Sequence, residues 1–99
     1  MPGQSETLET LRGHAEAIKG FGATSLYVYG SAARDEMNED SDVDVFIDYD
    51  EAGPFSFVEL IGLQEFLASQ LKRDVDLTTR GGLHPRLKAR IERSSIRVF

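Results

Sequence analysis

The stretch of sequence that decides the fold runs from residue 26 to residue 49 and reads LYVYGSAARDEMNEDSDVDVFIDY. Its first four residues are apolar or aromatic strand formers, and Gly30 ends the run. From Val43 to Tyr49, the branched apolar residues Val43, Val45 and Ile47 stand at every second position, with Asp44 and Asp48 on the other side, as in a strand that buries one face. The sequence therefore predicts two strands, the first of which leads into a tight turn at Gly30. Between them, residues 32–37 are predicted as a brief helix and residues 38–41 as a turn.

The sequence on either side of this stretch alternates between helical and extended patterns. One helix is predicted from residue 5 to about residue 20 and another from residue 55 to residue 72. A third strand is predicted at 74–79, followed by a helix that begins at Pro85 and a terminal strand at 96–99. The apolar faces of these helices are expected to comprise Leu8, Leu11, Ala15 and Ile18, then Phe57, Leu60, Ile61, Leu63, Leu67 and Leu71, and finally Leu87 and Ile91.

This order of elements predicts an α/β (α+β) fold, with helices packed on a small mixed β-sheet. At 99 residues the chain is expected to form a single domain spanning 1–99. No apolar run approaches the roughly 20 residues that a membrane span needs. Cysteine is absent, which excludes disulfides and a cysteine nucleophile. A polar N-terminal segment without a secretory pattern favours a cytoplasmic protein.

Charge is distributed unevenly along the chain. The net charge of −6 argues against general nucleic-acid binding, which depends on lysine and arginine. Residues 1–71 carry 14 acidic and 3 basic side chains, whereas residues 72–99 carry 3 acidic and 8 basic ones. The first part therefore suggests a cation site. The basic second part suggests either contact with an anion or a solvated helix.

A candidate metal site follows from the spacing of three aspartates. Asp42 and Asp44 stand at i and i+2 of a predicted strand, so both carboxylates project from one face, with their β-carbons within about 7 Å. Like charges this close raise one another's pKa, and a divalent cation bound through oxygen relieves the repulsion. Asp76, on another predicted strand, supplies a third carboxylate if the strands are neighbours. Three such aspartates indicate a Mg²⁺ site of the two-ion type used in phosphoryl chemistry.

A candidate phosphate site precedes the aspartates. Gly30 lets the backbone approach a ligand closely, and the amides after it, with the Ser31 hydroxyl, offer hydrogen bonds to phosphate oxygens. Arg34 lies one helical turn further and has the planar fork that suits a terminal phosphate. Neither a P-loop nor a dinucleotide-binding glycine motif occurs in the sequence.

The pattern Gly30-Ser31, ten intervening residues, Asp42-Val43-Asp44 and a later Val75-Asp76-Leu77 resembles the nucleotidyltransferase superfamily to which DNA polymerase beta belongs. Its closest likeness is to the smallest branch, the minimal nucleotidyltransferases (MNT). In that branch such domains are often antitoxins, which silence a helical HEPN ribonuclease toxin by adding AMP to a tyrosine. The resemblance covers residues 25–79 by motif and nearly the whole chain by length and element order.

The resemblance implies a role for each matching residue. Asp42 and Asp44 would bind both metal ions, and Asp76 would bind one ion and help deprotonate the attacking hydroxyl. Gly30 and Ser31 would hold the phosphates of ATP. Arg34 would bind nearer the end of the triphosphate.

Two neighbouring acids qualify this assignment. Asp35 stands where many members of the family have glycine, so the shape of the loop beside the phosphate site can differ. Asp74 shares a strand face with Asp76 and is the fallback for the third carboxylate. Asp76 is preferred, because its apolar neighbours indicate a more buried position.

The expected function is Mg²⁺-dependent transfer of AMP from ATP to a partner protein, with a HEPN-type toxin as the partner. Two alternatives stay open. The same surface could act as a binding module that holds a nucleotide or covers a toxin without chemistry. Nucleotidyl transfer to a small molecule, as in aminoglycoside-modifying relatives, ranks last because 99 residues leave no room for an acceptor-binding domain. A homo-oligomer could build that pocket across its interface.

Overall fold

The computed structural model describes residues 4–34 and 42–99. Four α-helices, one 3-10 helix and four strands are formed in these ranges. In chain order they are α1 (Gln4–Gly13), α2 (Ala15–Gly20), β1 (Ala23–Tyr29), β2 (Val43–Tyr49), α3 (Phe57–Leu71), β3 (Val75–Thr79), η1 (Arg80–Gly82), α4 (Lys88–Ser94) and β4 (Ile96–Arg97). None of these helices has the length and apolar character needed to cross a lipid bilayer.

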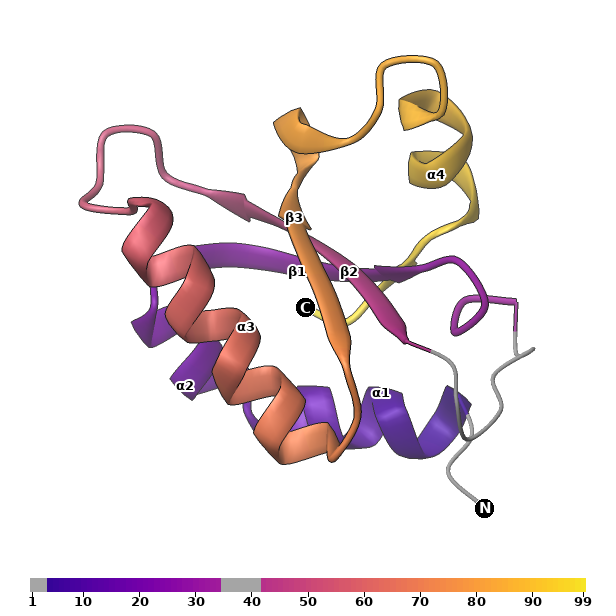
Figure 1. Cartoon of the computed structure of the whole chain (residues 1–99), viewed down its shortest axis with the longest axis horizontal. Coiled ribbons are helices and arrows are strands. Elements are labelled where there is room, and N and C mark those ends of the chain that lie inside the picture. The colour runs from indigo at the N-terminus through magenta and orange to yellow at the C-terminus, as the bar shows by residue number, and fades with distance from the viewer. Residues whose placement is uncertain (1–3, 35–41) are drawn as a thin grey trace.

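The four strands form one mixed sheet in the order β3-β2-β1-β4. β1 pairs antiparallel with β2 and with β4, whereas β2 and β3 run parallel. A parallel pair needs a crossover, and α3 supplies it between β2 and β3 (Figure 1). The predicted fold class, a small mixed sheet with helices packed on it, is therefore confirmed.

The two faces of the sheet have different surroundings. Val43, Val45 and Ile47 of β2 are fully buried in a core that also contains Leu11 and Leu63 from the helices. Figure 1 shows α1, α2 and α3 together on one side of the strands and α4 apart from them. The face of β2 that points away from the core carries Asp44, Phe46 and Asp48, and this face holds the candidate site.

The first predicted helix is in fact two helices. The chain turns at His14, between α1 and α2, and the His14 amide donates to the Leu11 carbonyl. Leu11 and Ile18 are still buried on the same side, so the apolar pattern was read correctly although the break was missed. The His14 ring packs edge-on against Phe66 of α3, with centroids 5.5 Å apart.

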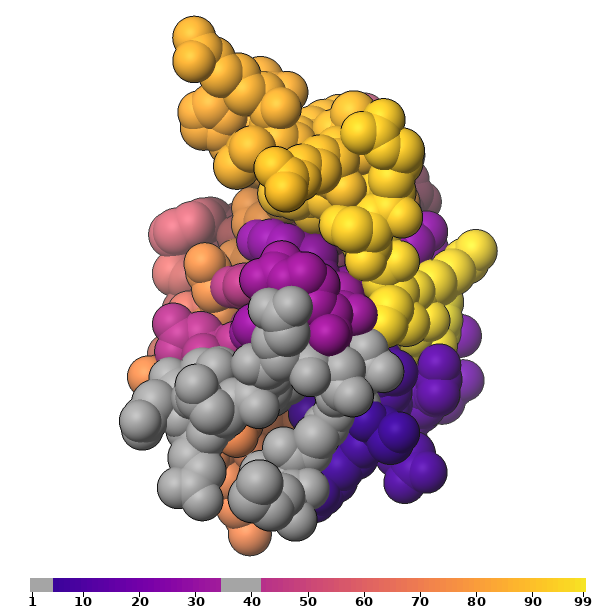
Figure 2. Space-filling model, turned by 90° about the vertical axis from the view of Figure 1, so that its right-hand side faces the viewer, coloured from indigo at the N-terminus to yellow at the C-terminus, as the bar shows by residue number. Residues whose placement is uncertain are grey.

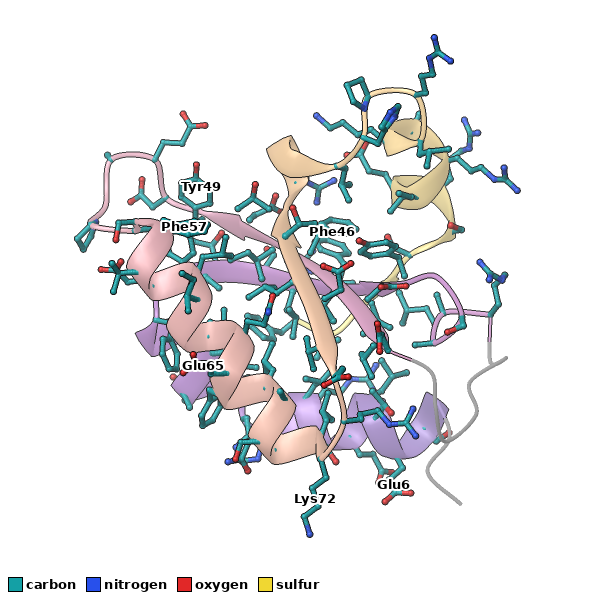
Figure 3. All side chains as sticks on the ribbon, in the orientation of Figure 1. Glu6, Phe46, Tyr49, Phe57, Glu65 and Lys72 are labelled. Carbon is teal, nitrogen blue, oxygen red and sulfur yellow. The ribbon has the colours of Figure 1, made fainter. Side chains whose placement is uncertain are left out.

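The buried face of α3 also differs from the predicted one. Leu63 and Leu67 are fully buried, but Phe57 is 71% exposed and Ile61 is 43% exposed, so both were wrongly assigned to the core stripe (Figure 3 labels Phe57). Phe66, expected off the stripe, packs against the core instead. The start of the helix is fixed by Ser56, which forms a capping box with Glu59.

The last helix begins later than predicted, because residues 85–87 form a turn and α4 starts at Lys88. Leu87 is 46% exposed and Ile91 only partly buried, so they do not form the inner face that the sequence suggested. Residues 31–34 form a turn, and the rest of the helix predicted at 32–37 lies outside the described residues. The same holds for the turn predicted at 38–41 and for Asp35.

Candidate functional site

The strand register brings two of the predicted aspartates side by side. Asp44 pairs with Asp76 across the parallel β2 and β3, and it pairs with Tyr29 across the antiparallel β1 and β2. These three residues therefore form one row across the sheet, on the face opposite the core. Asp42 precedes β2 and is exposed, and its negative charge acts on Asp44, so it lies beside this row.

The turn after β1 is fitted closely to this row. Gly30 has a φ of 70°, in the left-handed region that favours glycine. A β-carbon at this position would run into the Asp44 carboxylate. The absence of a side chain at residue 30 therefore lets the turn approach the Asp44 carboxylate.

The charges of the three aspartates act on one another. Burial raises the pKa of Asp44, and the negative charges of Asp76 and Asp42 raise it further, while Arg34 lowers it. The pKa of Tyr29 is raised to about 12, first by burial and then by Asp44 and Asp76. The sequence-predicted acids and Arg34 thus share one electrostatic environment, and Tyr29 belongs to it as well.

The donor set suits a hard cation, although no ligand cage is preformed. Within residues 4–34 and 42–99, no three His, Asp or Glu side chains converge closely enough to hold a metal ion by themselves. The adjacent carboxylates of Asp44 and Asp76 offer oxygen ligands, and a divalent cation would offset the repulsion that raises the pKa of Asp44. The chemistry of these residues therefore fits Mg²⁺. Asp76 is exposed, as is Asp74, so the more buried position predicted for Asp76 was wrong. Asp76 is instead distinguished by its pairing with Asp44 and by its charge, which raises the pKa of Asp44.

The predicted phosphate-binding residues lie in the turn after Gly30. Ser31 is partly buried and Arg34 is exposed, and the Arg34 amide donates to the Gly30 carbonyl over 3.2 Å. A pocket of about 190 Å³ opens beside this turn, between Gly30 and Arg34 on one side and α4 on the other. The structure thus places the predicted glycine, arginine and acids around one end of the sheet.

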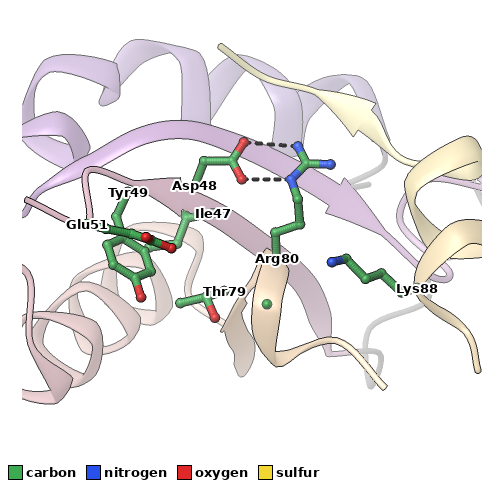
Figure 4. A pocket seen from close by; sticks show the side chains of 8 residues that line it. Ile47, Asp48, Tyr49, Glu51, Thr79, Arg80 and Lys88 are labelled. Atoms are coloured by element: carbon green, nitrogen blue, oxygen red, sulfur yellow. Dashed lines mark hydrogen bonds and ion pairs between the residues drawn. The ribbon is translucent and has the colours of Figure 1, made fainter. Parts of the chain in front are cut away.

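A larger pocket, of about 270 Å³, lies at the opposite end of β2 (Figure 4). Arg80 occupies its edge, donating to both Asp48 oxygens at 2.7 and 2.9 Å. The same guanidinium also donates to Glu92 of α4. Because Arg80 is already bound to the carboxylates of Asp48 and Glu92, this pocket is a weaker candidate for the reaction site than the end of the sheet at Gly30.

Sequence reasoning missed the aromatic residues that support the open face. Phe46 points away from the main core, yet it is completely buried, because Tyr27 stacks on it at 4.7 Å and Tyr29 packs at 5.9 Å. Figure 3 labels Phe46 in the middle of the strands. Arg80 covers the stack, with its Cζ 4.9 Å from the Tyr27 ring. Tyr27 and Tyr29, two residues apart in β1, were an available signal, whereas Phe46 of β2 stands between Asp44 and Asp48 and gives none.

Comparison with known proteins agrees with this geometry. The nucleotidyltransferase domain family matches residues 11–98. A relative from Methanocaldococcus jannaschii, MJ0126, provisionally named a protein adenylyltransferase, is 40% identical over 96 residues, or 95% of this chain and 96% of the relative. A solved structure provisionally described as a minimal nucleotidyltransferase is 35% identical, with a TM-score of 0.73 over 90% of this chain and 93% of that one.

A more distant solved structure shares the fold. It is the complex of a tri-AMPylated HEPN toxin from Shewanella oneidensis with its MNT antitoxin, and the matching chain is 17% identical, with a TM-score of 0.65 over 93% of this chain and 71% of that one. The family match spans most of the sequence, and the aspartate pair beside a glycine turn lies within it. The chain therefore belongs to the nucleotidyltransferase domain family, and within that family it is of the minimal nucleotidyltransferase kind.

Proposed function

We propose that this chain transfers AMP from ATP to a hydroxyl of a partner protein, in a Mg²⁺-dependent reaction, and that a tyrosine is the acceptor. The observation that carries the proposal is the pairing of Asp44 with Asp76 directly beside the Gly30 turn. The relative named as a protein adenylyltransferase, which matches 95% of this chain, supports AMP as the group and protein as the acceptor.

In this reaction the acceptor oxygen attacks the α-phosphorus of ATP. A bond forms between that oxygen and the phosphorus, and the bond from the α-phosphorus to the bridging oxygen of the β-phosphate breaks. Pyrophosphate leaves with the electron pair, and the hydroxyl proton passes to the Asp76 carboxylate. Asp76 suits this task because it is exposed at the edge of the row, where an acceptor can reach it.

The remaining residues of the site bind and orient the nucleotide. Asp42, Asp44 and Asp76 would hold two Mg²⁺ ions, which when bound neutralise charge on the phosphates and on the leaving group. The Gly30 and Ser31 backbone would hold phosphate oxygens. Most of the rate gain would come from positioning and charge neutralisation, since the protein forms no covalent bond itself.

The proposed partner is a HEPN-type toxin, so that the chain would act as an antitoxin. The distant complex with the same fold supports this choice, because its antitoxin is bound to a toxin that carries AMP groups. We further propose that residues 1–99 perform the reaction as one domain, because one core joins elements from both ends of the chain.

The test is to incubate the chain with ATP, Mg²⁺ and the HEPN ribonuclease encoded nearest to its gene, and to measure the intact mass of the ribonuclease. We expect a mass gain of one or more AMP groups. Asp76→Asn should lower the rate about 100-fold or more, because it removes both a metal ligand and the proton acceptor.

Asp74→Asn is the matched control, since it changes the same residue type two positions away, outside the row. It should leave the rate nearly unchanged. If no mass gain occurs, yet the chain still protects cells from the ribonuclease when Asp42 and Asp44 are both replaced by alanine, the chain is a binding module and the enzymatic proposal fails.

A further inference from the structure

The pocket beside the Gly30 turn joins two segments that are distant in sequence. Gly30 and Arg34 line it from the end of β1, while Arg90 and Ser94 line it from α4. Figure 2 shows the same arrangement from the side, where the yellow α4 region adjoins the purple-magenta segment that follows β1. The basic second part of the sequence, for which the aspartate site gives no reason, therefore reaches the candidate site through α4.

The charge of this pocket favours an anion. Two arginines, Arg34 and Arg90, line a space of about 190 Å³, and this concentration of positive charge attracts an anion such as a phosphate group. Arg34 also lowers the pKa of Asp44, so the pocket lies next to the row of aspartates. A phosphate group held here would be close to the carboxylates that would hold Mg²⁺.

The helix that carries Arg90 is anchored to the sheet. Glu92, two residues after Arg90, accepts a hydrogen bond from Arg80. Arg80 is itself held by Asp48 through two hydrogen bonds and lies over the rings of Tyr27 and Phe46 at 4.9 and 5.1 Å. α4 is therefore tied to β1 and β2, which fixes the helix backbone that carries Arg90 before a ligand arrives.

The size of the pocket indicates which part of a nucleotide it takes. Its volume is below the roughly 300–1,000 Å³ of a typical small-molecule site, so it suits a fragment of ATP rather than the whole molecule. Leu87 and Ile91 also line the pocket, which makes the adenine ring the rival occupant. The two arginines favour the phosphates, because their planar forks bind phosphate oxygens in pairs.

We propose that Arg90 of α4 also contacts the β- and γ-phosphates that the Gly30 turn and Arg34 would hold, and that it is a positioning residue for the pyrophosphate leaving group. The inference rests on the proposed function for its ligand. It adds a residue that lies far outside the Gly-Ser and aspartate motifs in the sequence.

The test is to measure, by isothermal titration calorimetry with Mg²⁺ present, the binding of ATP, AMP and pyrophosphate to the parent chain, Arg90→Gln and Arg93→Gln. Arg93→Gln is the matched control, since Arg93 is an exposed arginine of the same helix and does not line the pocket. Arg90→Gln should weaken ATP and pyrophosphate binding about tenfold, the usual effect of losing one charge-assisted contact.

AMP binding by Arg90→Gln should stay within about twofold of the parent, and Arg93→Gln should bind all three ligands like the parent. Arg90→Lys should bind ATP and pyrophosphate with affinities between those of the parent and of Arg90→Gln, because lysine keeps the positive charge but lacks the planar guanidinium group. The inference is overturned if Arg90→Gln binds pyrophosphate normally, if AMP binding falls as much as ATP binding, or if the parent binds no pyrophosphate.

These outcomes are separable from those of the proposed function. Transfer of AMP by the parent together with normal pyrophosphate binding by Arg90→Gln would leave the function standing and overturn the inference. Loss of pyrophosphate binding in Arg90→Gln, with no AMP transfer by the parent to any acceptor, would support the phosphate pocket and count against the transferase.

Discussion

At the scale of single residues, both the backbone conformation and the lack of space at residue 30 require glycine. Its φ of 70° is uncommon for residues with a side chain, and the space where a β-carbon would stand is taken by the Asp44 carboxylate. An added methyl group would have to displace either the turn or the acid. Since the turn and the acid belong to the proposed phosphate and metal sites, the same change should affect folding and function together.

We therefore expect Gly30→Ala to lower the free energy of unfolding by about 1 kcal/mol or more and to weaken ATP binding. The measurements are urea denaturation and ATP titration. Gly13→Ala is the control: no atom lies within 4 Å of its added β-carbon, and alanine is the better helix former by roughly 0.5–1 kcal/mol. Equal effects of the two substitutions would contradict the proposed fit between turn and acid.

The sequence predicted the positions of these candidate residues better than it predicted the packing around them. Gly30, Asp44 and Asp76 could be found because each is a residue type placed by a turn or by strand alternation. Phe46 could not be placed from its own strand, because alternation assigns it to the polar face. Its burial depends on Tyr27 and Arg80, which reach it only through tertiary packing.

At the scale of elements, α3 shows the limit of periodicity. Leu63 and Phe57 both fit the apolar stripe of the sequence, yet Leu63 is fully buried and Phe57 is 71% exposed. Phe57 is the first residue of the helix, and periodicity carries no information about which turns of a helix the rest of the chain covers.

Thermal or urea unfolding of alanine variants at Leu63 and Phe57 tests this difference in burial. Leu63→Ala should cost about 2–5 kcal/mol of stability because it leaves a cavity in the core. Phe57→Ala should change stability by only about 0.5 kcal/mol, as is usual for an exposed site. Comparable losses from the two substitutions would mean that Phe57 is covered in solution.

The contacts of Arg80 hold η1 and α4 to the sheet, and their strength should depend on pH. Arg80 lowers the pKa of Asp48, chiefly through their hydrogen bonds. The folded state therefore gains stability from this pair at pH values above the ordinary aspartate pKa of about 3.9. That gain is lost as the pH falls through the lowered pKa of the folded state.

Accordingly, Arg80→Gln should reduce stability by about 1 kcal/mol at pH 7, a modest value because both side chains are nearly a third exposed to water. The difference from the parent should shrink as the pH falls below about 4. Urea unfolding across this pH range measures it, with exposed Arg86→Gln as the control. A difference that stays constant with pH would rule out the ion pair as its source.

At the scale of the whole molecule, one core joins the two ends of the described chain. Leu8 of α1, Ile18 of α2, Leu63 of α3 and Val98 near the C-terminus belong to a single cluster of buried residues. Helices and sheet cannot separate without exposing that cluster, which predicts one cooperative unfolding transition.

Two signals can check this cooperativity. Tyr27, Tyr29 and Tyr49 all lie in β1 and β2, and the chain has no tryptophan, so tyrosine fluorescence reports on the sheet. Circular dichroism at helical wavelengths reports on α1 to α4. Coincident midpoints are expected, whereas earlier loss of the helical signal would show that the helices unfold independently.

We propose that the ends of β1, β2 and β3 together form one site for a nucleotide and its metal ions. The most direct measurement is a crystal structure of the chain grown with Mn²⁺ and a non-hydrolysable ATP analogue, with the metal located by anomalous scattering. We predict a metal peak between the carboxylates of Asp44 and Asp76, with phosphate density at Gly30 and Ser31. A nucleotide bound with its phosphates at the Arg80 end of the sheet, or a metal peak away from both aspartates, would contradict the account.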